Sequence, residues 1–252
     1  MEVHHPHHPT HKKKWSEYII EFVMLFTAVT LGFFAENIRE SIAEKHKKEE
    51  LLEAVVRDFK IDKSEIQLHR KMVQRRIDEC GRFTKFLQMD YKKVNKIEFY
   101  RSAMWYLENK GMILNEKARN DAEGKGYFTN YKNGELANIL NKYNYHFNDY
   151  KEMNLGVLES SKKYTTVTIN DVLDYKLIQK ADFAWYPNAK TNDKDFQGNL
   201  SAPVNIEIVK KIVFDAWMKR ILLQGELAAF DSMDVYANKA IALLHSENKE
   251  LD

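Results

Sequence analysis

The feature that most constrains this chain is an apolar stretch close to its N-terminus. Between Tyr18 and Ala35 the only charged residue is Glu21. A helix from Trp15 to Ala35 would be about 31 Å long, close to the hydrocarbon thickness of a bilayer. A cleaved signal peptide would have a shorter apolar core, a buried soluble helix is unusual at a chain end, and an amphipathic surface helix would need a polar face. We therefore predict a transmembrane helix at residues 15–36.

The flanking charges predict an orientation for this helix. Lys12, Lys13 and Lys14 precede it, and clustered positive charge stays on the cytoplasmic side of a membrane. Residues 1–14 are therefore expected to form a cytoplasmic tail, and residues 37–252 an extracytoplasmic domain. In a Gram-negative cell this places the anchor in the inner membrane and the domain in the periplasm.

Glu21 is the residue of the anchor that a plain tether would not need. It lies about 9 Å along the helix from Trp15, where a carboxylate is costly to hold in hydrocarbon. Two interpretations stay open. The carboxylate either reaches the cytoplasmic headgroups or is protonated, or it contacts a partner or carries a proton inside an oligomer.

The tail before the anchor is rich in histidine. Five imidazoles stand within eight residues: His4, His5, His7, His8 and His11. Neutral imidazole binds nickel, copper and zinc. Pro6 and Pro9 keep the chain extended, so no fixed geometry is preformed. A disordered tail with weak, nonspecific metal affinity is the preferred interpretation, with a selective metal sensor as the alternative, and we predict no cofactor.

The composition favours a helical domain behind the anchor. Only 9 Gly and 4 Pro interrupt 252 residues, of which 30% are charged. The net charge of +2 argues against a nucleic-acid partner, because such proteins show a basic excess. The single cysteine, Cys80, excludes an intrachain disulfide and a cysteine zinc site. We expect Cys80 to be a packed, inert thiol.

Two long helices are predicted by apolar residues at alternating spacings of four and three. In the first, the apolar first positions are 52, 59, 66, 73, 80 and 87. Its second positions are Val56, Lys63, Arg70, Ile77 and Thr84. The other pattern runs from 209 to 244 and is interrupted by Arg220 and Asp234, each of which could face Lys63, Arg70 or a polar neighbour. We expect the two helices to pack antiparallel in a bundle.

Shorter elements are predicted between these helices. Helices are expected at about 96–109 and 135–164, the latter with Leu155 among its core residues. Residues 165–169 have strand propensity, although Asn170 could instead start a short helix. An irregular loop is expected near 183–204.

The sequence contains no catalytic or nucleotide-binding motif. GxGxxG, GxxxxGK[ST], HExxH and GxSxG are all absent, so we predict that the protein is not an enzyme. An aromatic cluster around Tyr143 and Phe147 is expected to pack in the core. The alternative is a ligand pocket between helices, lined by Trp105, Tyr143, Phe147 and Trp217.

Two stretches carry a family resemblance. The first runs from Glu21 to Glu40, behind the His- and Lys-rich start, and the second comprises Gly126, Lys132, Asn133, Glu135, Leu136, Leu140 and Tyr143. They resemble an uncharacterised bacterial family of small single-span membrane proteins with a helical extracytoplasmic domain. The resemblance implies a membrane location and favours a periplasmic domain, and it implies no activity.

The sequence as a whole predicts an all-α protein with one N-terminal transmembrane helix followed by a long-helix bundle domain. Its expected function is that of a non-enzymatic envelope scaffold or interaction subunit. Its expected partners are the lipid bilayer and either a second copy of the chain or another membrane protein. The alternatives are a ligand-binding sensor and an accessory subunit of an ion-coupled membrane complex that uses Glu21.

Overall fold

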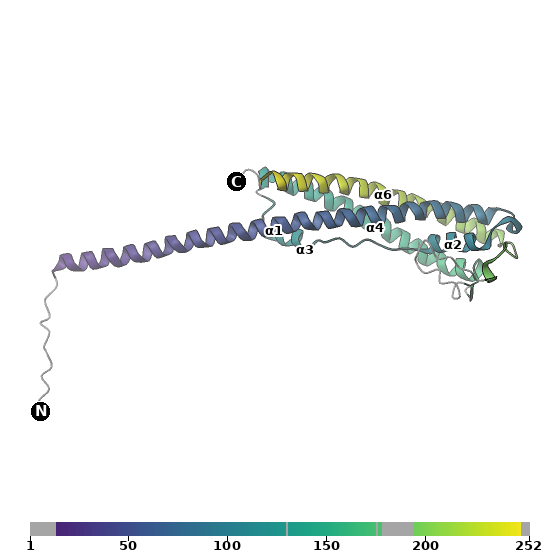
Figure 1. Cartoon of the computed structure of the whole chain (residues 1–252), viewed down its shortest axis with the longest axis horizontal. Helices are drawn as coiled ribbons and strands as arrows, with labels where there is room; N and C mark the ends of the chain where they lie inside the picture. The colour runs from purple at the N-terminus through teal and green to yellow at the C-terminus, as the bar shows by residue number, and fades with distance from the viewer. Residues whose placement is uncertain (1–13, 130, 175, 178–193, 248–252) are drawn as a thin grey trace, which may run out of the picture. The chain divides into compact units, whose positions relative to one another are not determined.

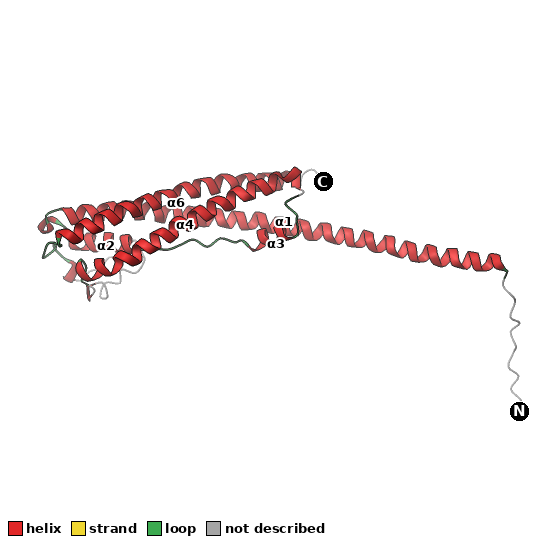
Figure 2. Ribbon diagram, turned by 180° about the vertical axis from the view of Figure 1, so that it is seen from behind, coloured by secondary structure: helices red, strands yellow, loops and turns green. Residues whose placement is uncertain are grey.

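The computed structural model describes residues 14–129, 131–174, 176–177 and 194–247. This part of the chain is helical, which confirms the all-α prediction (Figures 1 and 2). Its α-helices are α1 (Trp15–Gln88), α2 (Lys96–Leu107), α3 (Lys117–Gly124), α4 (Glu135–Asp171) and α6 (Ile206–Glu247). Short 3-10 turns occur at Tyr91–Lys93, Tyr131–Gly134 and Lys194–Phe196. The β pairing in these described ranges is a single bridge between Asn95 and Asn199.

The chain divides into two units, Met1–Leu51 and Leu52–Asp252, and α1 contributes residues to both. Among the described residues, α1 is the helix that is long and apolar enough to cross a membrane, through a segment near the N-terminus. Large apolar side chains such as Phe22 and Phe33 are exposed in this first unit. The hydroxyl of Thr27 donates to the Val23 carbonyl at 2.7 Å, so this polar group is satisfied within the helix, as a lipid environment requires.

In the second unit three long helices lie side by side: the part of α1 that starts at Leu52, α4 and α6 (Figures 1 and 2). Lys63 of α1 donates to Asn238 of α6, and Arg70 donates to Asp234 at 2.9 Å. The later of these two α1 residues contacts the earlier of the two α6 residues, so the two helices run in opposite directions. They are therefore antiparallel, as predicted. The contact between Arg70 and Asp234 pairs two of the polar interruptions in the predicted patterns.

The predicted first positions of both patterns are buried except Leu52, which is partly buried. Of the predicted second positions only Val56 and Ile77 are buried, and the others lie one residue away from the buried stripe. On α1 the buried stripe runs Val55, Phe59, Asp62, Ile66, His69, Val73, Arg76, Cys80, Phe83 and Leu87. On α6 it runs Val209, Ile212, Ala216, Lys219, Leu223, Glu226, Phe230, Met233, Ala237, Ala240 and Leu244. Lys63 and Arg70 are only partly buried at the edge of the interface, and Arg220 is exposed. Hydropathy misplaced the stripe because its true second positions include charged residues.

Helix α4 differs from its predicted form in three details. It extends to Asp171, so residues 165–169 are helical. Leu155 is 53% exposed and does not belong to the core. Asn154 lies in the inward stripe instead, three residues before the buried Val157, and donates to Glu226 at 3.3 Å. The predicted loop at 183–204 is described only from Lys194 onward, and its first part lies outside the described residues.

The segment between α1 and α4 runs back along the three long helices (Figures 1 and 2). Asn95 caps α2 by accepting from the Glu98 amide at 3.2 Å, and α2 ends at Leu107, two residues before the predicted end. Residues 108–116 then form a stretch without helical structure before α3 begins at Lys117. We call residues 108–116 the non-helical strap. Its backbone groups lack helical partners and must find others.

Candidate functional site

Five charged or titratable side chains form a line through the interior of the bundle. Asp62, His69 and Arg76 stand seven residues apart on α1, and Lys219 and Glu226 stand seven apart on α6. None is more than 6% exposed. We call these five residues the polar seam. Because a buried charge is costly unless it is paired or hydrogen-bonded, the contacts of the seam indicate what it does.

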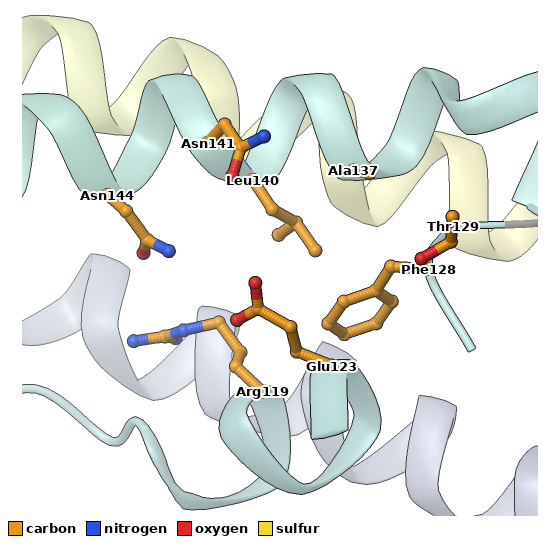
Figure 3. Close-up of a pocket in the computed structure, with 8 residues that line it drawn as sticks. All are labelled: Arg119, Glu123, Phe128, Thr129, Ala137, Leu140, Asn141 and Asn144. Atoms are coloured by element: carbon orange, nitrogen blue, oxygen red, sulfur yellow. The ribbon is translucent and has the colours of Figure 1, made fainter. Parts of the chain in front are cut away.

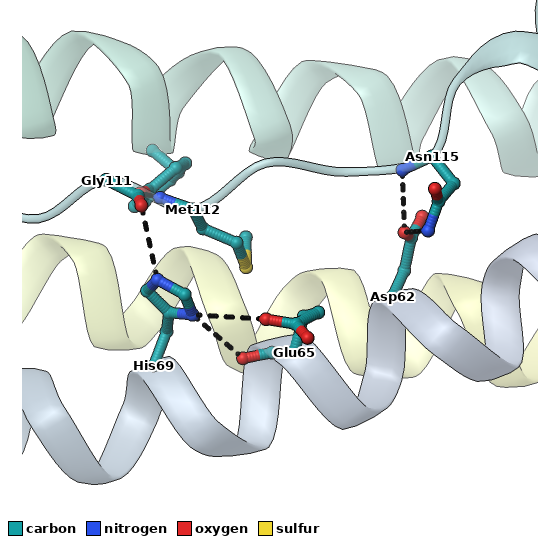
Figure 4. A network of polar contacts seen from close by, with 7 residues as sticks. Asp62, Glu65, His69, Gly111, Met112 and Asn115 are labelled. Atoms are coloured by element: carbon teal, nitrogen blue, oxygen red, sulfur yellow. Dashed lines mark hydrogen bonds and ion pairs between the residues drawn. The ribbon is translucent and has the colours of Figure 1, made fainter.

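The α1 side of the seam binds the backbone of the non-helical strap (Figure 4). Asp62 accepts from the backbone N–H of Asn115 at 2.9 Å. The Nε2 atom of His69 lies 3.2 Å from the carbonyl of Gly111, and the guanidinium of Arg76 donates to the carbonyl of Glu108 at 2.9 Å. These side chains replace the hydrogen bonds that a fourth helix would make within itself.

Arg119 on α3 fixes one end of this arrangement. Its Nη1 atom donates to Asp62 at 2.7 Å, and its guanidinium carbon lies 4.9 Å from the ring centre of Phe59 and 5.1 Å from that of Tyr143. Burial and the neighbouring charge of Asp62 raise the pKa of Tyr143, so its hydroxyl stays protonated and donates to Asp62 at 3.3 Å. The guanidinium therefore lies over two aromatic rings that contact each other, and these rings shield it from water.

Lys219 forms a second cluster near the other end of the seam. Its ammonium donates to the carbonyl of Tyr106 and, at 2.7 Å, to the hydroxyl of Ser161. Nearby, Asp215 accepts from the Tyr106 hydroxyl at 2.5 Å and from Ser160. An amine beside a hydroxyl is a pairing used in nucleophilic catalysis. Here Lys219 and Ser161 are both buried, so a substrate has no access and the pair serves the fold.

Lys219 gives the fold a pH dependence. Burial lowers its pKa from 10.5 to about 8, whereas burial raises that of Cys80 from 9.0 to about 11. Between pH 8 and 9 unfolding therefore takes up a proton at Lys219, and the free energy of unfolding should rise with pH by about 1 kcal/mol. Cys80 opposes this rise increasingly as the pH approaches and passes 9, because the thiol of the unfolded chain ionises first. Urea titrations should show the rise in the wild type and in Lys210→Met, an exposed control, and lose it in Lys219→Met.

A pocket of about 200 Å³ opens between α3 and α4 (Figure 3). The residues that line it are Arg119, Glu123, Phe128, Thr129, Ala137, Leu140, Asn141 and Asn144. Glu123, Asn141 and Asn144 are exposed and form a polar rim, whereas Arg119, Phe128 and Leu140 are buried and form the floor. The pocket therefore connects solvent with the guanidinium that pairs with Asp62.

The structure does not gather the predicted pocket residues into one site. Tyr143 and Phe147 are buried in the core, as the preferred interpretation expected. Trp105 is partly buried beneath the guanidinium of Arg75, and Trp217 is 55% exposed on α6. None of the four lines the α3–α4 pocket.

The other predicted sites give less information. The histidines of the tail, residues 4–11, lie outside the described residues. Glu21 lies exposed on the apolar segment of α1. Cys80 is fully buried, as expected of a packed thiol. Among the side chains that the structure describes, no group of three or more His, Cys, Asp or Glu could hold a metal ion.

Sequence reasoning missed the polar seam and Arg119. The sequence did contain a signal for the seam. A series with a spacing of seven residues begins and ends with an apolar residue and has three polar members between them: Val55, Asp62, His69, Arg76 and Phe83. No comparable signal marked Arg119, because α3 is a short and mostly polar helix.

Comparisons of the chain with models of protein families, with curated proteins and with solved structures find no match. The resemblance to single-span bacterial proteins therefore stays a prediction.

Proposed function

We propose that this protein is a non-enzymatic, membrane-anchored scaffold or interaction subunit, which associates with a second copy of itself through an exposed face of α6. The apolar segment of α1 supplies the anchor. The lysines at 12–14 support an inner-membrane orientation with the N-terminus in the cytoplasm and the second unit in the periplasm. The non-enzymatic part of the proposal is supported by the burial of the Lys219–Ser161 pair, which no substrate can reach.

The observation that carries the proposal is a run of large apolar side chains on the outer side of α6. Phe214, Trp217, Met218 and Ile221 are 60%, 55%, 39% and 44% exposed, and the rings of Phe214 and Trp217 are 6.0 Å apart. We call these four residues the α6 face. Contiguous exposed apolar side chains, and tryptophan above all, are typical of protein interfaces.

The charges around the α6 face favour a second copy as its occupant. Glu207 and Lys210 form an ion pair at 2.8 Å beside the exposed Lys211, so both signs are present. A surface that carries both positive and negative side chains can be complementary to a second copy of itself. A surface with charges of one sign would instead favour a partner of opposite charge. The net charge of +2 offers little repulsion between copies, and anchoring two chains in one membrane raises their effective concentration.

Charged substitutions in the α6 face should therefore dissociate the protein. We expect the double variant Trp217→Lys with Ile221→Lys to weaken self-association of the full chain in detergent micelles at least about a hundredfold, because two apolar contacts are replaced by like charges. Light scattering of the purified protein measures the change, and cross-linking in native membranes checks it there. The matched control is Leu155→Lys, which adds a charge at an exposed apolar residue of α4. A monomeric wild type, or a dimer that both variants leave intact, would refute self-association through α6.

A specific observation also favours a second candidate function. Glu21 places a carboxylate within a segment that is apolar enough to span a membrane. Ionisable groups at such positions commonly belong to proton or ion pathways. In an accessory subunit of an ion-coupled complex, Glu21 in the anchor would be the functional residue. In the scaffold or interaction subunit, the α6 face would be the functional surface.

A further inference from the structure

The pocket between α3 and α4 holds a buried donor that has nothing to bind. The Nη2 atom of Arg119 is buried and has no hydrogen-bond partner among the described residues, and Arg119 is 5% exposed. An unsatisfied guanidinium nitrogen in the interior is costly, because water has been removed and not replaced. Arg119 lines a pocket with an exposed rim, so a small shift of its side chain would bring this nitrogen to an acceptor that enters from solvent.

The charge around the pocket restricts what that molecule can be. Asp62 already compensates the positive charge of Arg119. Glu123 adds a carboxylate at the rim, and it makes no ion pair with a side chain that the structure describes. The two carboxylates and one guanidinium leave a net negative site, which disfavours a simple anion. A suitable ligand carries an acceptor for Arg119 and a positive group for Glu123.

The volume of the pocket and its other lining residues restrict the ligand further. About 200 Å³ is smaller than the pockets that hold drug-sized ligands. Figure 3 shows Arg119 and Glu123 reaching from α3 toward Asn141 and Asn144 on α4, so amide groups face both charges. Phe128 and Leu140 form the apolar part of the floor. The pocket thus combines a donor end, an acceptor end and a small apolar surface.

The geometry points to a binding site for a small α-amino acid. Its carboxylate would accept from Arg119 and an asparagine amide, its ammonium would pair with Glu123, and a short apolar side chain would contact Phe128 and Leu140. Charge-assisted hydrogen bonds at both ends are the strong contacts of such a complex. The site would make the second unit a receptor for amino acids. It is independent of the α6 face, so self-association and ligand binding can each fail alone.

Calorimetry on the full chain in detergent micelles tests this inference with three probes. L-alanine carries both charged groups, propionate lacks the ammonium, and ethylamine lacks the carboxylate. We expect saturable binding of alanine, at least about tenfold tighter than either of the other two, because each lost contact involves a charged group. Equal binding of alanine and propionate would overturn the zwitterion assignment. The absence of saturable binding by alanine, glycine and serine would overturn the site, leaving water to fill it.

Two variants locate the binding without touching the pair of Arg119 and Asp62. Glu123→Gln removes the rim carboxylate, and Ala137→Leu fills the pocket from α4 with a good helix former. Each should weaken alanine binding at least about tenfold while the melting temperature without ligand stays near that of the wild type. The matched control is Glu152→Gln, at an exposed position of α4 that does not line the pocket. Alanine binding that is unchanged in both pocket variants, or weakened equally in the control, would contradict the assignment.

Discussion

Replacing Asp62 by alanine is expected to lower the free energy of unfolding by about 3–5 kcal/mol, because it leaves a buried guanidinium without its counter-ion. The Arg119 side chain is 6% exposed and cannot turn to water without opening the packing of α3. The same change removes the acceptor of the Asn115 backbone N–H. The buried guanidinium of Arg119 and the buried hydroxyl of Tyr143 therefore lose their acceptor at once. Urea unfolding of the purified protein, followed by circular dichroism, measures the loss.

Two further variants separate the causes of this effect. Asp62→Asn keeps an oxygen for the Asn115 amide but removes the charge that faces Arg119, so its loss should be intermediate. Asp78→Ala removes an exposed aspartate from the same helix and should change stability by no more than about 0.5 kcal/mol. If Asp62→Ala were as mild as Asp78→Ala, the pair with Arg119 would not hold the fold together.

The second large effect is expected at Arg76. Its guanidinium donates to the Glu108 carbonyl, and burial raises the pKa of Glu108 and of Glu226, while the charge of Arg76 lowers both. Arg76→Met should therefore lower the free energy of unfolding at pH 7 by about 3–5 kcal/mol, because two buried carboxylates lose the positive charge that compensates them most. Urea titrations at two pH values measure this loss and its origin.

The sign of the pH dependence follows from the direction of these pKa shifts. A carboxyl group whose pKa is raised in the folded state contributes stability below its unfolded pKa, and this contribution is lost as the pH rises through the folded value. Without Arg76 the pKa values of Glu108 and Glu226 should rise further. Arg76→Met should therefore lose less stability at pH 4.5 than at pH 7. The exposed Arg57→Met serves as the control and should show little loss at either pH. A deficit at Arg76→Met that is independent of pH would indicate lost packing alone.

The sequence predicted much of the bundle, and the reason for its failures is physical. The spacing of apolar residues located the long helices and their antiparallel pairing, since burial of an apolar stripe determines both. The same reasoning misplaced the second stripe by one residue, because Asp62 and Lys219 look like surface residues to any hydropathy argument. The burial of Asp62 becomes intelligible only once residues 108–116 are known to be non-helical, and that of Lys219 once the carbonyl of Tyr106, near the end of α2, is known to lie beside it. A short segment that ends at Leu107 and resumes at Lys117 carries no periodicity from which its packing could be inferred.

The candidate sites were predicted less well than the fold for a related reason. Tyr143 and Phe147 are core residues, as the preferred interpretation expected, and they do not form the alternative pocket with Trp105 and Trp217. The pocket instead depends on Arg119 and Glu123, which share a helix of eight residues with little apolar pattern. Their proximity to Asn141 and Asn144 is a tertiary contact, which one sequence does not reveal. The exposed α6 face was equally hidden, because Trp217 had been considered a pocket residue.

Native-state hydrogen exchange tests most directly whether the polar seam holds the non-helical strap. The backbone N–H of Asn115 donates to Asp62 and that of Met112 donates to the Tyr150 hydroxyl at 2.5 Å. We expect both amides to exchange slowly although they lie outside any helix, and Asp62→Ala to speed exchange at Asn115 far more than in the core of α6. Rapid exchange at Asn115 in the wild type, or exchange there that Asp62→Ala leaves unchanged, would show that the strap is not held by the seam.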